Sequence, residues 1–432
     1  MKKGKAGRYW RVWRRLAARR MARAARGLRQ RASGKRRSVV MALAVAAVMS
    51  VGGYFANNLP LFTGEQFILF NLTARVKASL GLQRPESDDV TYINVSCDKE
   101  VVPFRGNLAV PIGKRAVTSR PMLLRLLTAL DSMARHDKDA YRYIMLDIRF
   151  EEGYDSEVDS LLFSLIHRMD RIVVAAHGDV ALADSARLLP KAGRNDYMTS
   201  VLNTSMVRYR YLQGDDHKSL PLRVYNGLEH RDIHRHGIVY TDGGRLCYNS
   251  VFLHFPVLDT DAVVPAGVDE AYGSHLLGND ILHADTSEPL PDVLRRLCRG
   301  KIVVVGDMDE DVHDTYMGKV PGAVASFRAF DTLRTHRHWV NWWLEALYFL
   351  LYALIAFGLL RRGVFLRRFF PFLAKSPSKL LRFAGSMVRY GLVLLLCSVL
   401  LSLFFDVHTS FFFASLCFAA LDMFINYKRY NK

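Results

Sequence analysis

Residues 301–306, with the sequence KIVVVG, determine the fold expected for most of this 432-residue chain. Ile302 to Val305 are consecutive β-branched residues with no polar alternation, a pattern typical of a strand that is buried on both faces. An acidic loop follows this strand, and Pro321-Gly322 then precede a helix expected over about 323–334. A strand of this kind usually belongs to a sheet that has helices on both sides.

Strand and helix signals alternate upstream of this run. Short β-rich runs predict further strands at 90–95, 143–148 and 171–176, with a helix in each interval, the second over 159–168. The first helix is expected to begin at Ser119, which can cap it, with Pro121 in its first turn. The alternation implies right-handed crossovers, so we predict an α/β domain over 58–338 with a largely parallel or mixed sheet.

Four apolar runs lie outside this domain, and each is long enough, or nearly so, to cross a hydrocarbon core of about 30 Å as a helix. They cover residues 38–57, 339–360, 390–405 and 411–427. The second run opens with Trp339, Trp342 and Trp343, as expected for an aromatic belt at a membrane interface. We therefore predict four transmembrane α-helices in a lipid bilayer, the last two forming a hairpin.

The formal charge of +19 is carried by three acid-free segments next to these runs. Residues 1–37 contain 16 Lys or Arg, residues 361–389 contain 8, and residues 427–432 contain 3. The positive-inside rule places all three in the cytoplasm, including the tail 428–432. We therefore expect a multi-pass protein of the cell inner (plasma) membrane, with both termini cytoplasmic and the 58–338 domain extracytoplasmic.

The basic leader, residues 1–37, has apolar residues spaced by three or four between Tyr9 and Arg31, which predicts an amphipathic helix. Such a helix can lie on an anionic leaflet, or its charges can serve only to set topology. A cleaved signal peptide competes with a retained anchor at 38–57, but this leader is too long for an ordinary basic n-region. We expect no nucleic-acid partner, because no recognised motif accompanies the charge.

Two acids, Glu345 and Asp422, fall within the apolar runs. An acid inside a membrane is a functional hypothesis by default. Glu345 lies one turn from the tryptophans and Asp422 is close in sequence to Lys428 and Arg429. We therefore expect both carboxylates to reach an interface.

The best candidate site is a set of acids at the predicted carboxyl ends of three strands. Asp98, Asp147 and Asp307 follow the strands at 90–95, 143–148 and 301–306, and ligands of open α/β sheets bind at that edge. The adjacent loop adds Asp309, Asp311, His313 and Asp314. The cluster could bind a divalent metal or a cationic solute; alternatively these acids cap helices or pair with Arg149 and Arg328. We assign no metal ligand, no cofactor and no catalytic residue.

Three histidines, His230, His234 and His236, precede the predicted strand at Gly237. An i, i+4 pair on a helix would suit a metal or a proton sensor. Because a strand follows at once, we favour a solvated loop.

Several of these segments resemble the CHASE family of bacterial extracellular sensor domains, in its second type. The resemblance lies in the strand and turn from Ile93 to Asp98, the segment Leu146–Phe150, the Asp-Gly hairpin within Gly237–Arg245, and Lys301–Gly306 followed by Asp311, Thr315 and Pro321-Gly322. The arrangement of one span, an external domain and three further spans is also that of the family. The resemblance implies a signal receiver that is commonly joined to a cyclase or a kinase.

The sequence favours an integral membrane sensor without an output domain of its own, because only a few residues follow the fourth run. The signal would then pass to a membrane or cytoplasmic partner protein, with a homo-oligomer as a further option. The alternatives are a structural subunit of an envelope complex and an extracytoplasmic metal-dependent hydrolase. No Walker loop, Gly-x-Ser-x-Gly or His-Glu-x-x-His motif is present, so we do not expect an enzyme.

The link between the domain and the second apolar run is expected to be stiff. No Gly or Pro occurs between Ala323 and Trp339, which predicts an almost unbroken helix that could act as a lever.

The predicted topology can be tested by labelling single cysteines introduced at about residues 20, 200 and 375. We expect a membrane-impermeant reagent to reach only the middle position in intact cells, because the basic segments are retained inside. External labelling at 375 would contradict the arrangement of four spans.

Overall fold

The computed structural model describes residues 35–58, 65–81, 89–105, 111–178, 180–199, 206–253, 275–277, 290–315, 318–362, 378–405 and 411–430. The chain divides into two compact units, Pro60–Val340 on the one hand and Met1–Leu59 with Asn341–Lys432 on the other. Most of the basic leader and much of the 361–389 loop lie outside the described residues.

A six-stranded sheet forms the centre of the Pro60–Val340 unit. Its strand order is β15-β1-β16-β4-β5-β6, and every neighbouring pair is parallel. The strands are β15 (His275–Leu277), β1 (Val90–Asn94), β16 (Ile302–Gly306), β4 (Tyr143–Asp147), β5 (Ile172–Ala176) and β6 (Ala192–Arg194). All four strands expected from the sequence are present in it, and β16 lies between β1 and β4. The predicted α/β class with a parallel sheet is confirmed.

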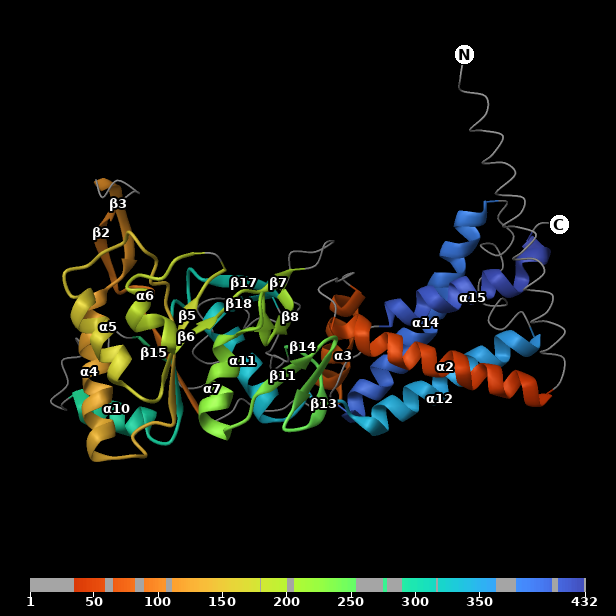
Figure 1. Ribbon diagram of the computed structural model, residues 1–432, viewed down its shortest axis with the longest axis horizontal. Helices are drawn as coiled ribbons and strands as arrows, with labels where there is room; N and C mark the ends of the chain where they lie inside the picture. Colours follow the sequence, from red (N-terminus) through yellow and green to blue (C-terminus); the bar gives the residue numbers. More distant parts are fainter. Residues whose placement is uncertain are drawn as a thin grey trace, which may run out of the picture. The chain divides into compact units, whose positions relative to one another are not determined.

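Helices cover both faces of this sheet (Figure 1). On one face, α4 (Arg120–His136), α5 (Asp159–Arg168) and α10 (Leu290–Cys298) enclose a core with alternate strand residues such as Ile93, Ile144 and Val303. On the other face lie α11 (Gly322–Arg334) and α7 (Leu220–Glu229), and the ring of Phe327 meets that of Tyr92 edge-on at 5.8 Å. As predicted, the Ser119 side chain caps α4 by accepting a hydrogen bond from the backbone N–H of Met122.

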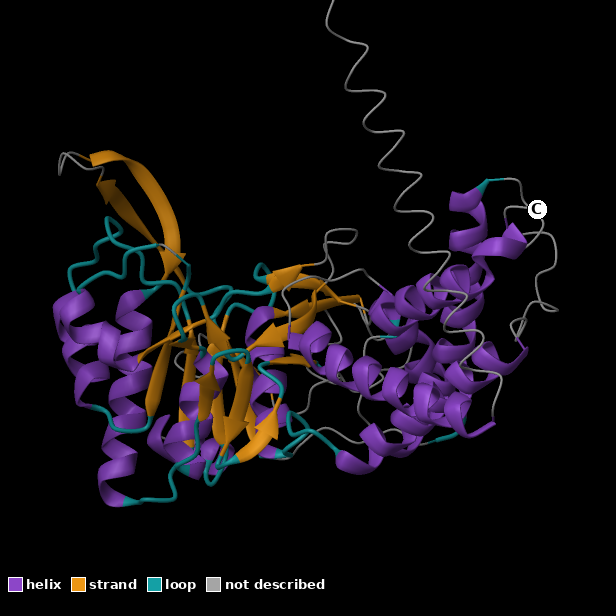
Figure 2. Ribbon diagram, turned by 45° about the vertical axis from the view of Figure 1, so that its right-hand side comes forward, coloured by secondary structure: helices purple, strands orange, loops and turns teal. Residues whose placement is uncertain are grey.

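Further strands lie outside the central sheet, and all of their pairs are antiparallel except that of β17 with β8. A second sheet has the order β14-β8-β17-β18, with β7 on β8; its strands are β14 (Ser250–Phe252), β8 (Met206–Arg210), β17 (Val312–Thr315), β18 (Gly318–Pro321) and β7 (Met198–Thr199). Two hairpins stand apart from this sheet. The short one pairs β9 (Leu212–Gln213) with β10 (His217–Lys218), and the longer one pairs β2 (Lys99–Arg105) with β3 (Pro111–Thr118) and projects from the domain in Figure 2. Three further helical elements of this unit are α3 (Glu65–Ser79), α6 (Ser185–Leu188) and η1 (Leu189–Lys191), of which the last two are short.

The histidine-rich segment forms a strand. β11 (Ile233–His236) pairs with β12 (Val239–Asp242), and β12 pairs with β13 (Arg245–Cys247), so the predicted Asp-Gly hairpin is confirmed. The expectation of a loop at the histidines was wrong. Ile233 is buried in β11, whereas His234, Arg235 and His236 are all exposed, so the strand buries only its first residue.

The unbroken helix predicted after Ala323 is also corrected. α11 ends at Arg334, and His336 then adopts a left-handed conformation with φ of 56°. The segment after α11 is held against the end of β12. His338 Nε2 and the Trp339 indole nitrogen lie 2.9 and 2.7 Å from the same Asp242 carboxylate oxygen. Trp339 therefore belongs to the α/β unit.

Among its described residues, the second unit contains three helices long and apolar enough to cross a membrane, at Arg36–Asn58, Trp342–Arg361 and Leu380–Phe405, and a shorter apolar one at Phe412–Ile425. They belong to α2 (Lys35–Asn58), α12 (Trp342–Arg362), α14 (Lys379–Phe405) and α15 (Phe412–Tyr430). Trp342 and Trp343 are exposed at the start of α12. The structure thus contains three candidate spans with a shorter fourth helix. α14 begins eleven residues before the predicted third run.

A buried polar contact joins α14 to α15. Asp422 is 2% exposed; it accepts a hydrogen bond from Ser386 Oγ at 2.8 Å and lies 3.4 Å from Arg389 Nη2. Asp422 is therefore buried between two helices, where Ser386 and the cation Arg389 of the neighbouring helix satisfy its carboxylate.

The hydrogen bonds of His338 and Trp339 to Asp242 are expected to stabilise the C-terminal end of the α/β unit. Burial raises the pKa of Asp242, but the hydrogen bonds from His338, Trp339 and Tyr225 outweigh burial and hold that pKa at about 2. Asp242→Asn is expected to cost about 1–3 kcal/mol, a fall of roughly 2–10 °C in melting temperature. Thermal unfolding of the full chain in mild detergent, followed by tryptophan fluorescence, measures this.

Asp292→Asn is the matched control, because the contact of Asp292 with the described residues is an exposed i, i+3 pair with Arg295 on α10. We expect this variant to melt within about 2 °C of the wild type. Equal melting temperatures for both variants would contradict the role of Asp242.

Candidate functional site

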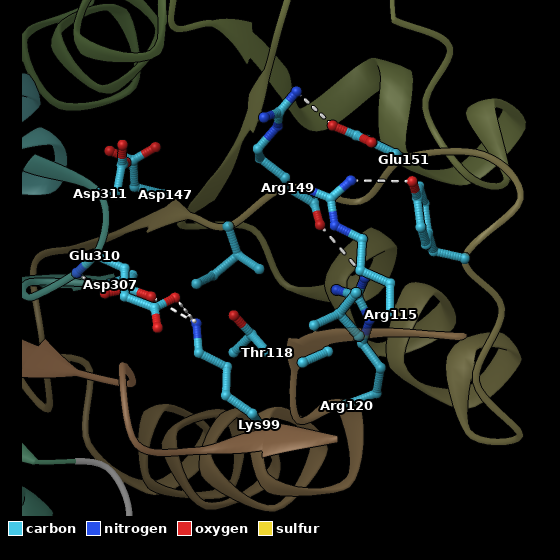
Figure 3. Close-up of a pocket in the computed structure, with 14 residues that line it drawn as sticks. Lys99, Arg115, Thr118, Arg120, Asp147, Arg149, Glu151, Asp307, Glu310 and Asp311 are labelled. Carbon is cyan, nitrogen blue, oxygen red and sulfur yellow. Dashed lines mark hydrogen bonds and ion pairs between the residues drawn. The ribbon is translucent and has the colours of Figure 1, made fainter. Parts of the chain in front are cut away.

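A cavity of about 330 Å³ lies at the carboxyl edge of the central sheet (Figure 3). Its wall is rich in charged side chains of both signs. The lining residues are Lys99, Arg115, Ala116, Val117, Thr118, Arg120, Asp147, Ile148, Arg149, Glu151, Tyr154, Asp307, Glu310 and Asp311. They come from the β2–β3 hairpin, the start of α4, and the segments that follow β4 and β16.

The parallel pairing of β16 with β4 places two of the predicted acids together. Gly306 is in register with Asp147, so Asp307 follows directly beside it. Gly306 also permits the close approach of α11, because a Cβ atom there would lie 2.6 Å from the Cβ of Ala323. The terminal glycine of the KIVVVG run therefore brings the helix N-terminus against the ends of the strands.

Asp147 sits in a buried network of neutral hydrogen-bonding groups. Its carboxylate accepts hydrogen bonds from Asn195 Nδ2 at 2.8 Å and from Ser326 Oγ at 3.3 Å, and Tyr209 in turn donates to Asn195 Oδ1 at 2.8 Å. Burial raises the pKa of Asp147, and the nearby charge of Asp311 adds to the effect, so that the pKa is about 7. Asp147 can therefore exchange a proton near neutral pH, which is a property more common at functional sites than in structural ion pairs.

Asp307 is held in its ionised form by a basic partner. Burial raises its pKa, but Lys99 Nζ, 2.6 Å from Oδ2, and the backbone N–H groups of Asp309 and Glu310 outweigh burial and bring the pKa below its usual value. Lys99 also lies 3.3 Å from Glu310. The partner of Asp307 is thus a lysine of the β2 strand, and neither of the two arginines expected from the sequence.

Asp311 extends the acidic side of the cavity. Figure 3 shows its carboxylate close to that of Asp147. His313 Nε2 lies 3.2 Å from Asp311 Oδ1, and the His313 ring contacts that of Tyr197 with centroids 4.1 Å apart. The carbonyl oxygen of Asp311 accepts a hydrogen bond from Gly322 N at 2.7 Å, so the loop is fixed to the start of α11.

The opposite side of the cavity is basic. Arg149 pairs with Glu151, and Arg115 Nη1 donates to the Tyr154 hydroxyl at 3.0 Å. Arg120 is 1% exposed, and its guanidinium lies over the Phe150 ring at 4.3 Å. Burial lowers the pKa of Arg120, although an arginine remains cationic at neutral pH.

The structure brings some of the predicted site residues together and not others. Asp147, Asp307 and Asp311 line the cavity, and His313 contacts Asp311. Asp309 turns away to accept hydrogen bonds from Ser96 and Asn94. The remaining two, Asp98 and Asp314, are absent from the lining; Asp98 is buried and Asp314 is exposed on β17.

The divalent-metal hypothesis gains no support from this geometry. Within the described ranges, no three or more His, Cys, Asp or Glu side chains are grouped so that they could hold a metal ion. The basic residues Lys99, Arg115 and Arg120 were not found from the sequence. The sequence predicted the position of the site, at the carboxyl edge of the sheet, but not that these three basic side chains would line it.

The chain matches no protein-family model, and searches of curated proteins and of solved structures gave no significant match.

The pKa of Asp147 predicts how stability depends on pH. A carboxyl whose folded pKa is raised from 3.8 to about 7 binds its proton more tightly in the folded state, so stability falls as pH rises between those values. A tenfold difference in proton affinity between the folded and unfolded states corresponds to about 1.4 kcal/mol of stability. Asp147→Asn keeps a neutral acceptor for Asn195, so its melting temperature should fall less than that of the wild type between pH 5 and about 8.

The measurement is thermal unfolding of the full chain at a series of pH values in one detergent. Asp216→Asn, which alters an exposed pair with Arg235, serves as the control and should follow the wild-type curve. If Asp147→Asn has the same pH profile as the control, Asp147 does not titrate in this range.

Proposed function

We propose that this chain is an integral membrane sensor whose α/β domain receives an extracytoplasmic signal and passes it to a partner protein. The cavity at the carboxyl edge of the sheet carries the proposal, because that edge is where open α/β sheets bind ligands. Its acids and arginines are held in place by the surrounding strands and helices. A purely structural surface would not require a buried carboxylate with a pKa near 7.

The proposed topology has four spans, including the shorter helix at Phe412–Ile425, and a cytoplasmic location for both termini and the 361–389 loop. The acid-free basic segments support this orientation through the positive-inside rule. The resemblance to type-two CHASE domains supports the sensor function, since it covers the turns that flank the cavity at Asp147 and Asp311. The partner would read the basic segments or the spans.

The test is affinity purification of the full chain from its native membrane in mild detergent, followed by mass spectrometry. We expect a cyclase, a kinase or a regulator of one of these to co-purify. Asp307→Asn and Asp311→Asn should accumulate normally, because the groups are partly exposed and such pairs contribute about 1 kcal/mol or less. Both variants should nevertheless change the amount of partner recovered.

Asp216→Asn is again the matched control and should recover partner at the wild-type level. Recovery of envelope structural proteins alone, at the same level in all variants, would favour the structural-subunit alternative. Failure of both cavity variants to accumulate would make Asp307 and Asp311 structural residues.

A further inference from the structure

Two carboxylates at the carboxyl edge of the sheet lie against the same face of α11. Ser326 Oγ is 3.3 Å from Asp147 Oδ2, and a Cβ atom on Gly322, one helical turn earlier, would lie 2.6 Å from Asp311 Oδ2. Residues four apart share one face of a helix, so the start of α11 brings the two acids together. Figure 3 shows their carboxylates close to each other at one side of the cavity.

Two acids this close in a mostly buried site do not readily carry two charges. Asp147 is 7% exposed, whereas the side chain of Asp311 is 46% exposed and lies 3.2 Å from His313 Nε2. Asp147 therefore bears the larger cost of ionisation, because Asp311 keeps its contact with water. Both acids line the cavity, which gives protons from solvent a route to Asp147.

The hydrogen bonds around Asp147 can be completed in either protonation state. The Ser326 hydroxyl is 3.3 Å from Asp147 Oδ2 and 3.0 Å from Asn195 Oδ1, but it has a single hydrogen to donate. When Asp147 is ionised, Ser326 donates to the carboxylate. The Tyr209 hydroxyl, 2.8 Å away, then satisfies Asn195 Oδ1. When Asp147 is protonated, the carboxyl donates to Ser326 Oγ, and Ser326 donates to Asn195.

The tyrosines and one histidine near Asp147 are held neutral around neutral pH. Burial raises the pKa of Tyr197 and of Tyr209 well above the usual value for a phenol. Burial, with the charge of Arg149 as a second cause, lowers the pKa of His177. These groups therefore keep their charge state while Asp147 titrates.

His313 is the other group at this edge that can gain a proton, and its charge favours the ionised form of Asp147. The remaining charged side chains here are held by partners of their own, namely Lys99 with Asp307 and Glu310, Arg149 with Glu151, and Asp196 with the backbone N–H of Gly178.

The loop that carries Asp311 is coupled to α11. It leads into β17, which pairs with β18, and Pro321 at the end of β18 directly precedes the helix. The backbone N–H of Gly322 also donates to the Asp311 carbonyl oxygen at 2.7 Å. A negative charge on Asp147 repels the Asp311 carboxylate, so ionisation of Asp147 loosens this loop from the edge of the sheet.

We propose that the signal received by this domain is the external proton concentration, with Asp147 and Asp311 as the proton-binding pair and residues 307–315 as the element that responds. The inference rests on the proposed sensor function, for which it names the signal. The pKa of Asp147 is raised from 3.8 to about 7, so the closed arrangement binds the proton more tightly than an open one. The closed arrangement is therefore favoured in acid and weakens as pH rises through about 7.

The first measurement is an infrared titration of the full chain in mild detergent. The C=O stretching band of a protonated carboxyl should disappear with a midpoint at pH about 7, and this component should be missing from Asp147→Asn. Asp311→Asn should lower the midpoint by about one pH unit or more, because a neighbouring negative charge is removed. Ser326→Ala should raise the midpoint, because the ionised carboxylate loses a donor.

The second measurement is hydrogen–deuterium exchange of residues 307–315, divided at each pH by the intrinsic exchange rate. In the wild type the opening constant should rise about tenfold from about pH 6 to about pH 8, because opening returns the pKa of Asp147 towards its usual value. Asp147→Asn should show little change over this range. His313→Gln should keep the wild-type direction, and Asp216→Asn, which alters an exposed pair with Arg235, should follow the wild-type curve.

The proposal is overturned if no carboxyl band is lost specifically from Asp147→Asn, or if the opening constant has the same pH dependence in that variant and in the wild type. If Asp147→Asn fails to accumulate, Asp311→Asn decides the matter, because its side chain is half exposed. An unchanged infrared midpoint in a folded Asp311→Asn chain would then overturn the proton-binding pair.

This failure is distinguishable from failure of the sensor function. A signalling partner whose recovery responds to Asp307→Asn, together with an Asp147 that does not titrate, would leave a sensor for another signal and overturn the present inference. A titrating Asp147 with a responding loop, but only structural partners recovered, would support the proton-binding pair and contradict the sensor function.

Discussion

The central constraint on this protein is that a parallel sheet covered on both faces leaves only the ends of its strands for charged groups. Because β16 lies between β1 and β4, the residues after these strands must share one edge. The close packing of Ala323 against Gly306 then brings α11 to the same edge. Ser326 can therefore reach Asp147, and the burial that raises the pKa of this carboxyl follows from the packing of the sheet.

Much of the central sheet could be predicted from the sequence, because its strands are short apolar runs rich in β-branched residues. The second sheet could not. Its strands have two to five residues and pair across long separations, as β8 does with β14 and β17. Such strands take their stability from tertiary contacts, so local propensity carries little information about them.

The part of the candidate site that follows directly after the predictable strands could also be predicted. Acids directly after a recognisable strand can be placed at the carboxyl edge without knowing the tertiary structure, and Asp147 and Asp307 lie there. Arg115 and Arg120 reach the same cavity only through the β2–β3 hairpin and the start of α4, whose positions depend on tertiary packing. The buried contact of Asp422 with Arg389 was missed likewise, because only the packing of α14 against α15 brings these residues together.

The path by which a sensor of this design could transmit a signal is constrained by α11. Its first turn is fixed to the cavity by Gly322 and Ser326, through Asp311 and Asp147. Its last turn is followed by the left-handed His336 and by the contacts of His338 and Trp339 with Asp242. A stiff lever running directly into the next apolar helix is therefore excluded by the turn after Arg334. A ligand that displaced α11 would act first on this hydrogen-bonded turn, and it could shift the turn only by binding one arrangement of it more tightly than another.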